Sequence, residues 1–351
     1  MTASSRRRGR KAPSQPLPEP VRLRTSGPAD LLELVPYLLG FHPTESVVLV
    51  VIRGREVALA ARVDLPPIAA VDQLVDRLSE IADRNGASAV VVFTFSEDPV
   101  AATELMLRLI EGLRPFGLVD AIHADGRRWW SMICADRCCP EDGTPYGSGS
   151  GRLAAEAVYA GLSTRSSRHE IEALVAGPDA TEEAALRNVV ERVADDLGPS
   201  SRVQRRSEMA ELVNGFLAEP RSLGDAECSR FALLAADVEV RDVAWSLMSR
   251  DRAEDHVDLW QQVVSRTVSP LESAPLCLLG MAAWISGNGA LMVCCLERVS
   301  TLDPAYTMAG LLEDINRRGV PPKAWDMLAE SMREVVGPLA GDGQSIPSPT
   351  G

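Results

Sequence analysis

Apolar positions in the first 150 residues fall into short runs of the kind that buried strands require. Such continuous, β-branched runs occupy 47–52, 57–65, 89–95, 118–123 and 128–133. The turn sequences Arg53-Gly54-Arg55 and Asp125-Gly126 separate the first two and the last two runs, which predicts two hairpins.

Helical spacing fills the gaps between these runs. Apolar residues recur every three or four positions from near Ser26 to Gly40, from Val71 to Ile81 and over 99–113, and Gly40 and Asn85-Gly86 are typical helix ends. The predicted order is therefore α-ββ-α-β-α-ββ. This order indicates an N-terminal α/β layered domain with a mixed sheet over 25–150.

The pattern changes after a loop rich in Gly, Pro and Ser at 139–151. Beyond it the spacing is helical, and we expect an all-α domain over 151–338. Its predicted helices occupy 152–162, 168–176, 181–197, 207–218, 225–236, 239–249, 252–267, 274–286, 289–301, 304–318 and 322–335. The spacing of Leu276, Gly280 and Pro304 predicts one hairpin resembling a tetratricopeptide repeat, so the fold class is α+β/α.

Three segments show where the globular part begins and ends and whether it enters a membrane. The basic stretch 1–24 and the Gly/Ser/Pro-rich stretch 339–351 are expected to be disordered tails. The uncharged stretch 273–296 is long enough to span a bilayer, but the turn at 286–289 favours two buried helices and no membrane contact. No secretory signal is visible and the cysteine number is odd, so we expect a cytoplasmic protein.

Charge and composition remove several classes of function. The net charge of −13 argues against nucleic-acid binding, apart from a contribution by the basic tail. Lys11 and Lys323 are the only lysines beside 34 arginines, and neither has the context of a P-loop, a kinase strand or a pyridoxal Schiff base. We expect no cofactor, and the sequence leaves open whether the protein is an enzyme.

Several stretches resemble an actinobacterial family known as domain of unknown function 4192. The resemblance is carried by the stretch 34–48, by 61–66, by Arg128-Trp129-Trp130-Ser131, by Cys138-Cys139-Pro140 and by 287–290. It covers roughly 30–328 and implies a high-GC Gram-positive source. It implies no activity, so the functional residues have to be argued from their own chemistry.

One candidate pocket is polar and lies next to strand ends. Arg62 and Asp64 are two residues apart and therefore share a face of one strand. We expect these two residues and four further polar residues to form an acid–base or anion-binding pocket. The alternative is a simple ion pair between Arg62 and Asp64 at the sheet edge. The candidate residues are His42, Glu45, Ser46, Arg62, Asp64 and Arg128.

The cysteine loop is a second candidate. Cys134, Cys138 and Cys139 offer thiol ligands, and His123 on the preceding strand offers a nitrogen. No second cysteine pair follows at zinc-ligand spacing, so packing of the loop is the favoured interpretation. Metal binding and redox chemistry remain alternatives.

Two further motifs have structural explanations. Gly149-x-Gly151-x-x-Ala154 matches the letters of a dinucleotide fingerprint, but no strand precedes it, which favours an interdomain loop. Trp129 and Trp130 are adjacent in a strand and must point to opposite faces, which predicts that one ring lies in the core and the other packs against the helical half or a partner.

The favoured function is a non-enzymatic interaction or scaffold protein whose helical domain binds a protein partner. The alternative is an enzyme or a small-ligand or anion-binding protein. Its pocket would lie between the sheet edge, with Arg62, Asp64 and Arg128, and the cysteine loop 134–146, where a metal could also bind. Oligomeric state is left open.

Overall fold

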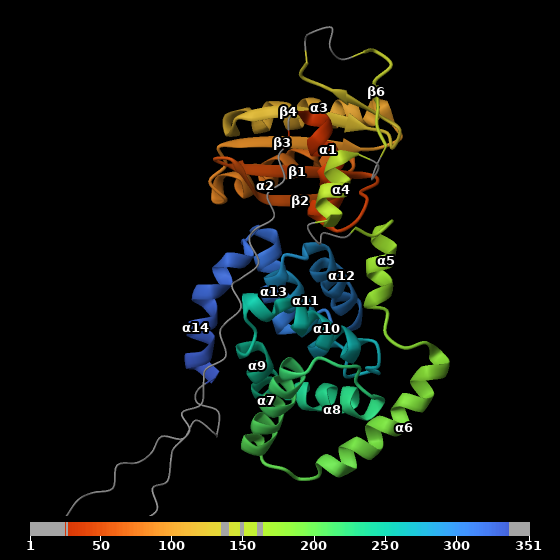
Figure 1. Ribbon diagram of the computed structural model, residues 1–351, viewed down its shortest axis with the longest axis vertical. Coiled ribbons are helices and arrows are strands. Elements are labelled where there is room, and N and C mark those ends of the chain that lie inside the picture. Colours follow the sequence, from red (N-terminus) through yellow and green to blue (C-terminus); the bar gives the residue numbers. More distant parts are fainter. Residues whose placement is uncertain (1–24, 26, 135–139, 148–150, 160–163, 337–351) are drawn as a thin grey trace, which may run out of the picture.

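The computed structural model describes residue 25 and residues 27–134, 140–147, 151–159 and 164–336. A sheet flanked by helices forms one half of the molecule, and a wholly helical half follows it in the chain (Figure 1). The predicted fold class is confirmed. Among the described residues beyond 150, no strand is present.

The sheet has the order β2-β1-β3-β4-β5-β6 in the described part of the chain. All neighbours are antiparallel except β3 and β4, which helix α3 connects. The predicted strands are present, and a short strand, β6, lies within the loop predicted to be irregular. The bounds are β1 Ser46–Arg53, β2 Glu56–Asp64, β3 Ala89–Phe95, β4 Leu118–Ala124, β5 Arg128–Ser131 and β6 Thr144–Pro145.

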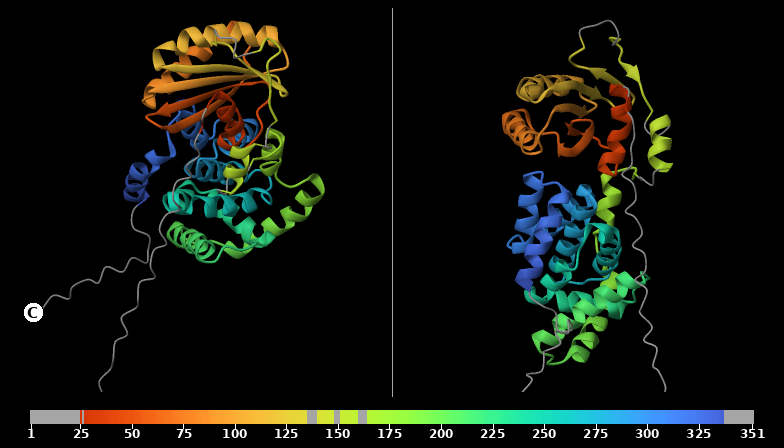
Figure 2. Two further views of the ribbon diagram at one scale, coloured as in Figure 1. Left: turned by 45° about the horizontal axis from the view of Figure 1, so that its top comes forward. Right: turned by 60° about the vertical axis from the view of Figure 1, so that its left-hand side comes forward.

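Helices cover both faces of this sheet (Figure 2). Alternate β1 residues Val47 and Leu49 pack with helices α2 (Val71–Arg84) and α3 (Pro99–Leu113), whereas Val48 and Val50 point to the face with α1 (Pro28–Leu39). Burial on both faces explains why the strand runs are continuously apolar.

Local sequence fixes the ends of these helices. Asp98 begins α3 because its carboxylate accepts hydrogen bonds from the backbone N–H groups of Val100 and Ala101. Gly40 ends α1 with a φ of 82°, a conformation that glycine adopts without a steric penalty. The chain is thereby turned from α1 into β1.

The second half is a bundle in which α11 is buried nearly throughout. Helices α11 and α12 form the hairpin predicted over 274–301, and Gly280 lets them approach closely beside Cys295. Among the described residues, no helix has the length and apolar character needed to cross a bilayer. The bounds are α4 Arg152–Tyr159, α5 Arg168–Leu174, α6 Ala180–Leu197, α7 Arg202–Ala218, α8 Asp225–Ala235, α9 Val238–Ser246, α10 Ala253–Val264, α11 Ser273–Ser286, α12 Gly289–Leu302, α13 Thr307–Arg317 and α14 Trp325–Val336.

The two halves share a continuous apolar core on the α1 side of the sheet. Polar contacts add to it at the end of α2, where the Asn85 amide donates to the carbonyl oxygen of Gly319 at 3.1 Å. Arg84 donates to the carbonyl oxygen of Arg318 at 2.8 Å. These contacts hold the end of α2 against the turn that follows α13, and the candidate site lies at this junction.

Candidate functional site

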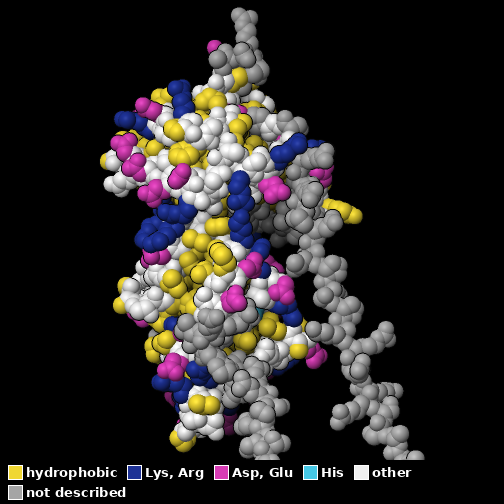
Figure 3. Space-filling view, turned by 90° about the vertical axis from the view of Figure 1, so that its left-hand side faces the viewer, with side chains coloured by type: hydrophobic (Ala, Val, Ile, Leu, Met, Phe, Trp, Pro, Cys, Tyr) yellow, Lys and Arg dark blue, Asp and Glu magenta, His cyan; other side chains and the backbone are white. Residues whose placement is uncertain are grey.

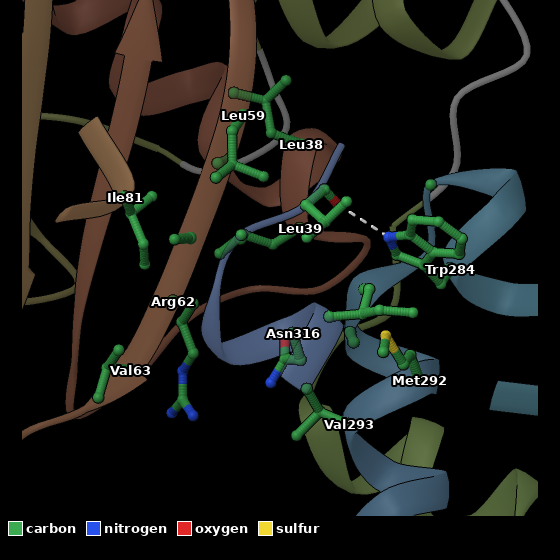
Figure 4. A pocket seen from close by; sticks show the side chains of 18 of the residues that line it. Leu38, Leu39, Leu59, Arg62, Val63, Ile81, Trp284, Met292, Val293 and Asn316 are labelled. Atoms are coloured by element: carbon green, nitrogen blue, oxygen red, sulfur yellow. Dashed lines mark hydrogen bonds between the residues drawn. The ribbon is translucent and has the colours of Figure 1, made fainter. Parts of the chain in front are cut away.

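A cleft of about 310 Å³ lies between edge strand β2 and the helical half (Figure 4). Six consecutive residues of β2, 59–64, line one wall. The opposite wall comes from α11, α12 and the end of α13, and α1, α2 and Arg168 of α5 also contribute. The cleft therefore exists only because the two halves are docked.

One part of the cleft is apolar. Trp284 is its largest side chain, and its indole N–H donates to the carbonyl oxygen of Val320 at 2.9 Å, the dashed line in Figure 4. This hydrogen bond fixes the ring while leaving the apolar face of the indole for packing. Other apolar lining residues are Leu38, Leu39, Leu59, Ile81, Met292 and Val293.

Arg62 supplies charge to the cleft. Its guanidinium contacts Asp64 at 2.5 Å, donates to the carbonyl oxygen of Thr44 at 3.3 Å and lies 5.8 Å from the centre of the Phe41 ring. The side chain is only 15% exposed, and its buried Nε–H has no acceptor within the described chain. Arg62 is thus held in place with its buried Nε–H unsatisfied within the described chain.

Arg77 of α2 lines the same cleft and differs from Arg62 in having no carboxylate beside it among the described residues. Its Nε–H is also buried without an acceptor, and within the described residues no ion pair or hydrogen bond of its side chain is found. A buried donor without a partner is costly, so native proteins satisfy almost all of them.

Arg168 of α5 is the third arginine at the cleft, and it is fully paired. It hydrogen-bonds to Glu297, lies 3.7 Å from Glu172 and lies 3.9 Å from Asp64. Asp64 therefore sits between two guanidinium groups, Arg62 and Arg168. This network links the end of β2 to helices α5 and α12.

The same network contains a possible metal-ligand set, Glu172, Cys294 and Glu297, whose ligand atoms lie within 4.8 Å of one another. Arg168 occupies this cluster and compensates both carboxylates. Burial raises the pKa of the Cys294 thiol, although Arg168 acts in the opposite direction. A protonated thiol and two paired carboxylates describe an ion-pair network better than a metal centre.

The predicted residues before β1 hold the sheet together. Glu45 accepts hydrogen bonds from the Ser96 hydroxyl at 3.2 Å and from the backbone N–H of Glu97 at 3.1 Å. Ser46 is completely buried opposite Asp64. His42 is half-buried, and burial lowers its pKa. These three lie near Arg62 and Asp64 but do not line the cleft.

Arg128 does not join them, so the six predicted residues do not converge into one pocket. The sheet order puts four strand steps between β2 and β5, which is about 19 Å at the usual strand spacing. Arg128 donates instead to the carbonyl oxygens of Asp142 at 3.0 Å and Gly143 at 2.9 Å. The cleft at β2 consequently faces the helical half and not the loop 134–146.

The cysteine loop is only partly described. Cys134 is half-buried after β5, whereas Cys138 and Cys139 lie outside the described residues, so the metal prediction stays a prediction. Trp129 and Trp130 point to opposite faces, as predicted. Trp129 packs against the shared core, but Trp130 stacks on His123 at 5.4 Å and donates to the carbonyl oxygen of Glu141, away from the helical half.

The segment with the dinucleotide-like letters begins helix α4. Glu33 of α1 accepts a hydrogen bond from the backbone N–H of Ala154 at 3.3 Å. A side chain at Gly151 would collide with the same carboxylate. The protein's own Glu33 therefore takes the place that a phosphate would need. Gly149 lies outside the described residues.

Sequence reasoning missed most of the cleft. Arg77, Arg168, Trp284 and Asn316 are far apart in the sequence, and each is an ordinary member of a helical pattern. The one available signal was the Arg62-x-Asp64 spacing, which identified the β2 wall.

Fold and cleft together define a two-part protein with an interdomain pocket. The chain belongs to the family described as domain of unknown function DUF4192, whose model matches residues 28–323. Comparison with curated proteins and comparison with solved structures give no match.

Proposed function

We propose that the protein binds a small organic ligand in the cleft between β2 and the helical half. The observation that supports this proposal is the composition of the cleft, an apolar wall beside a charged end, built by β2 together with helices from both halves. Ligand pockets combine these two features and favour domain junctions. We further propose, from the odd number of cysteines and the family resemblance, that binding takes place in an actinobacterial cytoplasm.

A neutral fluorescent probe, N-phenyl-1-naphthylamine, tests the proposal, because its emission rises in apolar sites. The wild-type protein should bind it with saturable fluorescence. Ala61→Trp places an indole in the cleft from β2 and should abolish this signal. Val57→Trp is the matched control, since Val57 is on the same strand, 42% exposed, and outside the cleft.

Thermal unfolding of both variants checks that each still folds. A wild-type protein that binds no probe, or an Ala61→Trp variant that folds and binds it unchanged, contradicts the proposed function. A loss of signal in both tryptophan variants also counts against it, because the effect would then not be specific to the cleft.

Binding of a protein partner through the helical half stays a prediction. Helices α13 and α14 expose Leu311 and Leu328 partly and Met327 by 75%, and Figure 3 shows hydrophobic side chains on the helical half. Capture of interacting proteins by the wild-type chain and by Met327→Glu tests it. A partner lost only with the variant supports this prediction, and identical captures contradict it.

A further inference from the structure

We infer that the ligand of the cleft is an anion with an apolar body, its carboxylate or phosphate group bound by Arg62 and Arg77. This inference rests on the proposed function and specifies the chemical class of the ligand. It is carried by two buried N–H donors on separate elements, β2 and α2, that border one cavity and have no acceptor within the described chain.

Arg62 is positioned for such a role before any ligand arrives. Asp64, the Thr44 carbonyl and the Phe41 ring occupy the rest of its guanidinium surroundings and restrict its rotation. The side chain therefore loses little conformational freedom on binding. Its remaining Nε–H needs an acceptor, and an anionic oxygen makes the strongest hydrogen bond with a guanidinium.

Arg77 supplies a positive charge that no carboxylate of the described chain neutralises, whereas the charge of Arg62 is neutralised by Asp64. Arg62 shares Asp64 with Arg168, whereas Arg77 has no carboxylate beside it among the described residues. Of the three arginines that line the cleft, Arg62 is paired with Asp64, and Arg168 is paired with Glu297 and with Glu172. Arg77 therefore carries the one cleft guanidinium without a carboxylate beside it among the described residues. Figure 3 shows Lys and Arg side chains gathered where the two halves meet. The unpaired charge of Arg77 favours a negatively charged ligand.

Asn316 adds a neutral polar group. It lies on α13, across the cleft from Arg62 on β2 (Figure 4). Its amide offers donors and an acceptor, which a carboxylate or phosphate ester and a neighbouring hydroxyl would satisfy. The apolar wall around Trp284 then receives the body of the ligand.

A matched pair of probes separates charge from apolar binding. 8-Anilino-1-naphthalenesulfonate is the same molecule as N-phenyl-1-naphthylamine with one sulfonate added. Wild-type protein should bind the sulfonate at least about tenfold more tightly, the size expected for a hydrogen bond to a charged group. If both probes bind equally well, the anion inference is wrong and the proposed function survives. If neither binds, both are wrong.

Arg77→Gln is the decisive variant, because removing an unpaired side chain should leave the fold intact. We expect roughly tenfold weaker binding of the sulfonate and unchanged binding of the neutral probe. Arg108→Gln on the exposed face of α3 makes the same charge change outside the cleft and should alter neither affinity. Equal losses in Arg77→Gln and Arg108→Gln would show a general charge effect and overturn the inference.

Competition distinguishes the two anionic groups. Decanoate and decyl phosphate are titrated against the bound sulfonate probe, with decanol as the neutral reference. Displacement by either anion at concentrations where decanol has no effect supports the inference, and the stronger competitor identifies the head group. Displacement by decanol as effective as by both anions contradicts it.

Discussion

The two edges of the sheet carry arginines that look equivalent in the sequence and have different surroundings. Toward the opposite edge, Arg128 lies on β5 beside the edge strand β6 and donates hydrogen bonds to the carbonyl oxygens of Asp142 and Gly143, which holds a loop. At the β2 edge, Arg62 keeps a buried donor without an acceptor, and Arg77 lies on the same cleft without an ion pair in the described chain.

The comparison shows which property distinguishes a structural arginine from a ligand-binding one. Whether its N–H donors have acceptors within the protein is more informative than its position on a strand. A satisfied guanidinium contributes to stability and has little left to offer a ligand. An unsatisfied one costs stability in the free protein and recovers it when an anion binds. Variants at the two edges should therefore affect different measurements.

The largest effect is expected at the helical wall of the cleft. Trp284→Ala removes a side chain that is 5% exposed, and should lower the free energy of unfolding by about 3–5 kcal/mol. Urea unfolding measures this, and Trp284→Phe, which keeps most apolar contacts, should cost less. A loss below about 1 kcal/mol would show that the wall does not depend on Trp284.

At the far edge, Arg128→Ala should lower the free energy of unfolding by about 1–2 kcal/mol, because two carbonyl oxygens lose their donor. Binding of the sulfonate probe should stay unchanged. Urea unfolding measures the free energy of unfolding, and titration of the same sample with the sulfonate probe measures its affinity. Weakened probe binding in a folded variant would place Arg128 at the ligand site and remove the contrast between the edges.

His123 on the interior strand β4 should make stability depend on pH, with an effect smaller than that of the Trp284→Ala and Arg128→Ala substitutions. Burial lowers the pKa of His123, although Asp125 and Glu45 act in the opposite direction. The unfolded chain, with a histidine pKa of about 6.5, then binds a proton more readily, so stability is lost as pH falls below that value. Unfolding of His123→Gln at pH 7.5 and 5.0 should show a smaller loss than the wild type; an equal loss would contradict this.

The smallest effect on stability is expected for Arg77→Gln, within about 0.5 kcal/mol, since no partner of Arg77 is found in the described chain. Because the substitution removes a buried N–H donor without an acceptor in the described chain, we expect any change to be a slight increase in the free energy of unfolding. Thermal and urea unfolding measure it. A loss as large as that of Arg128→Ala would mean that Arg77 is structural, and the two edges would then be alike.

Most of the fold was predictable because local physics sets it. Helix α3 was predicted at its observed bounds, 99–113, since the apolar spacing through Leu105, Leu109 and Leu113 marks its length. The strand β6 was missed because two residues give no periodic signal. Of the candidate site, the Arg62–Asp64 pair was predicted because residues two apart on a strand share a face.

The sequence by itself determined which segments are strands and helices, where the chain changes from mixed to helical, and that Arg62 and Asp64 point the same way. Each of these depends on neighbours within a few residues. Only the tertiary structure decided that β2 is the edge facing the helical half, that Arg128 lies about 19 Å away, and that Arg77 and Trp284 border one cleft. Strand order and domain docking bring together residues about 200 positions apart, and no local pattern records those contacts.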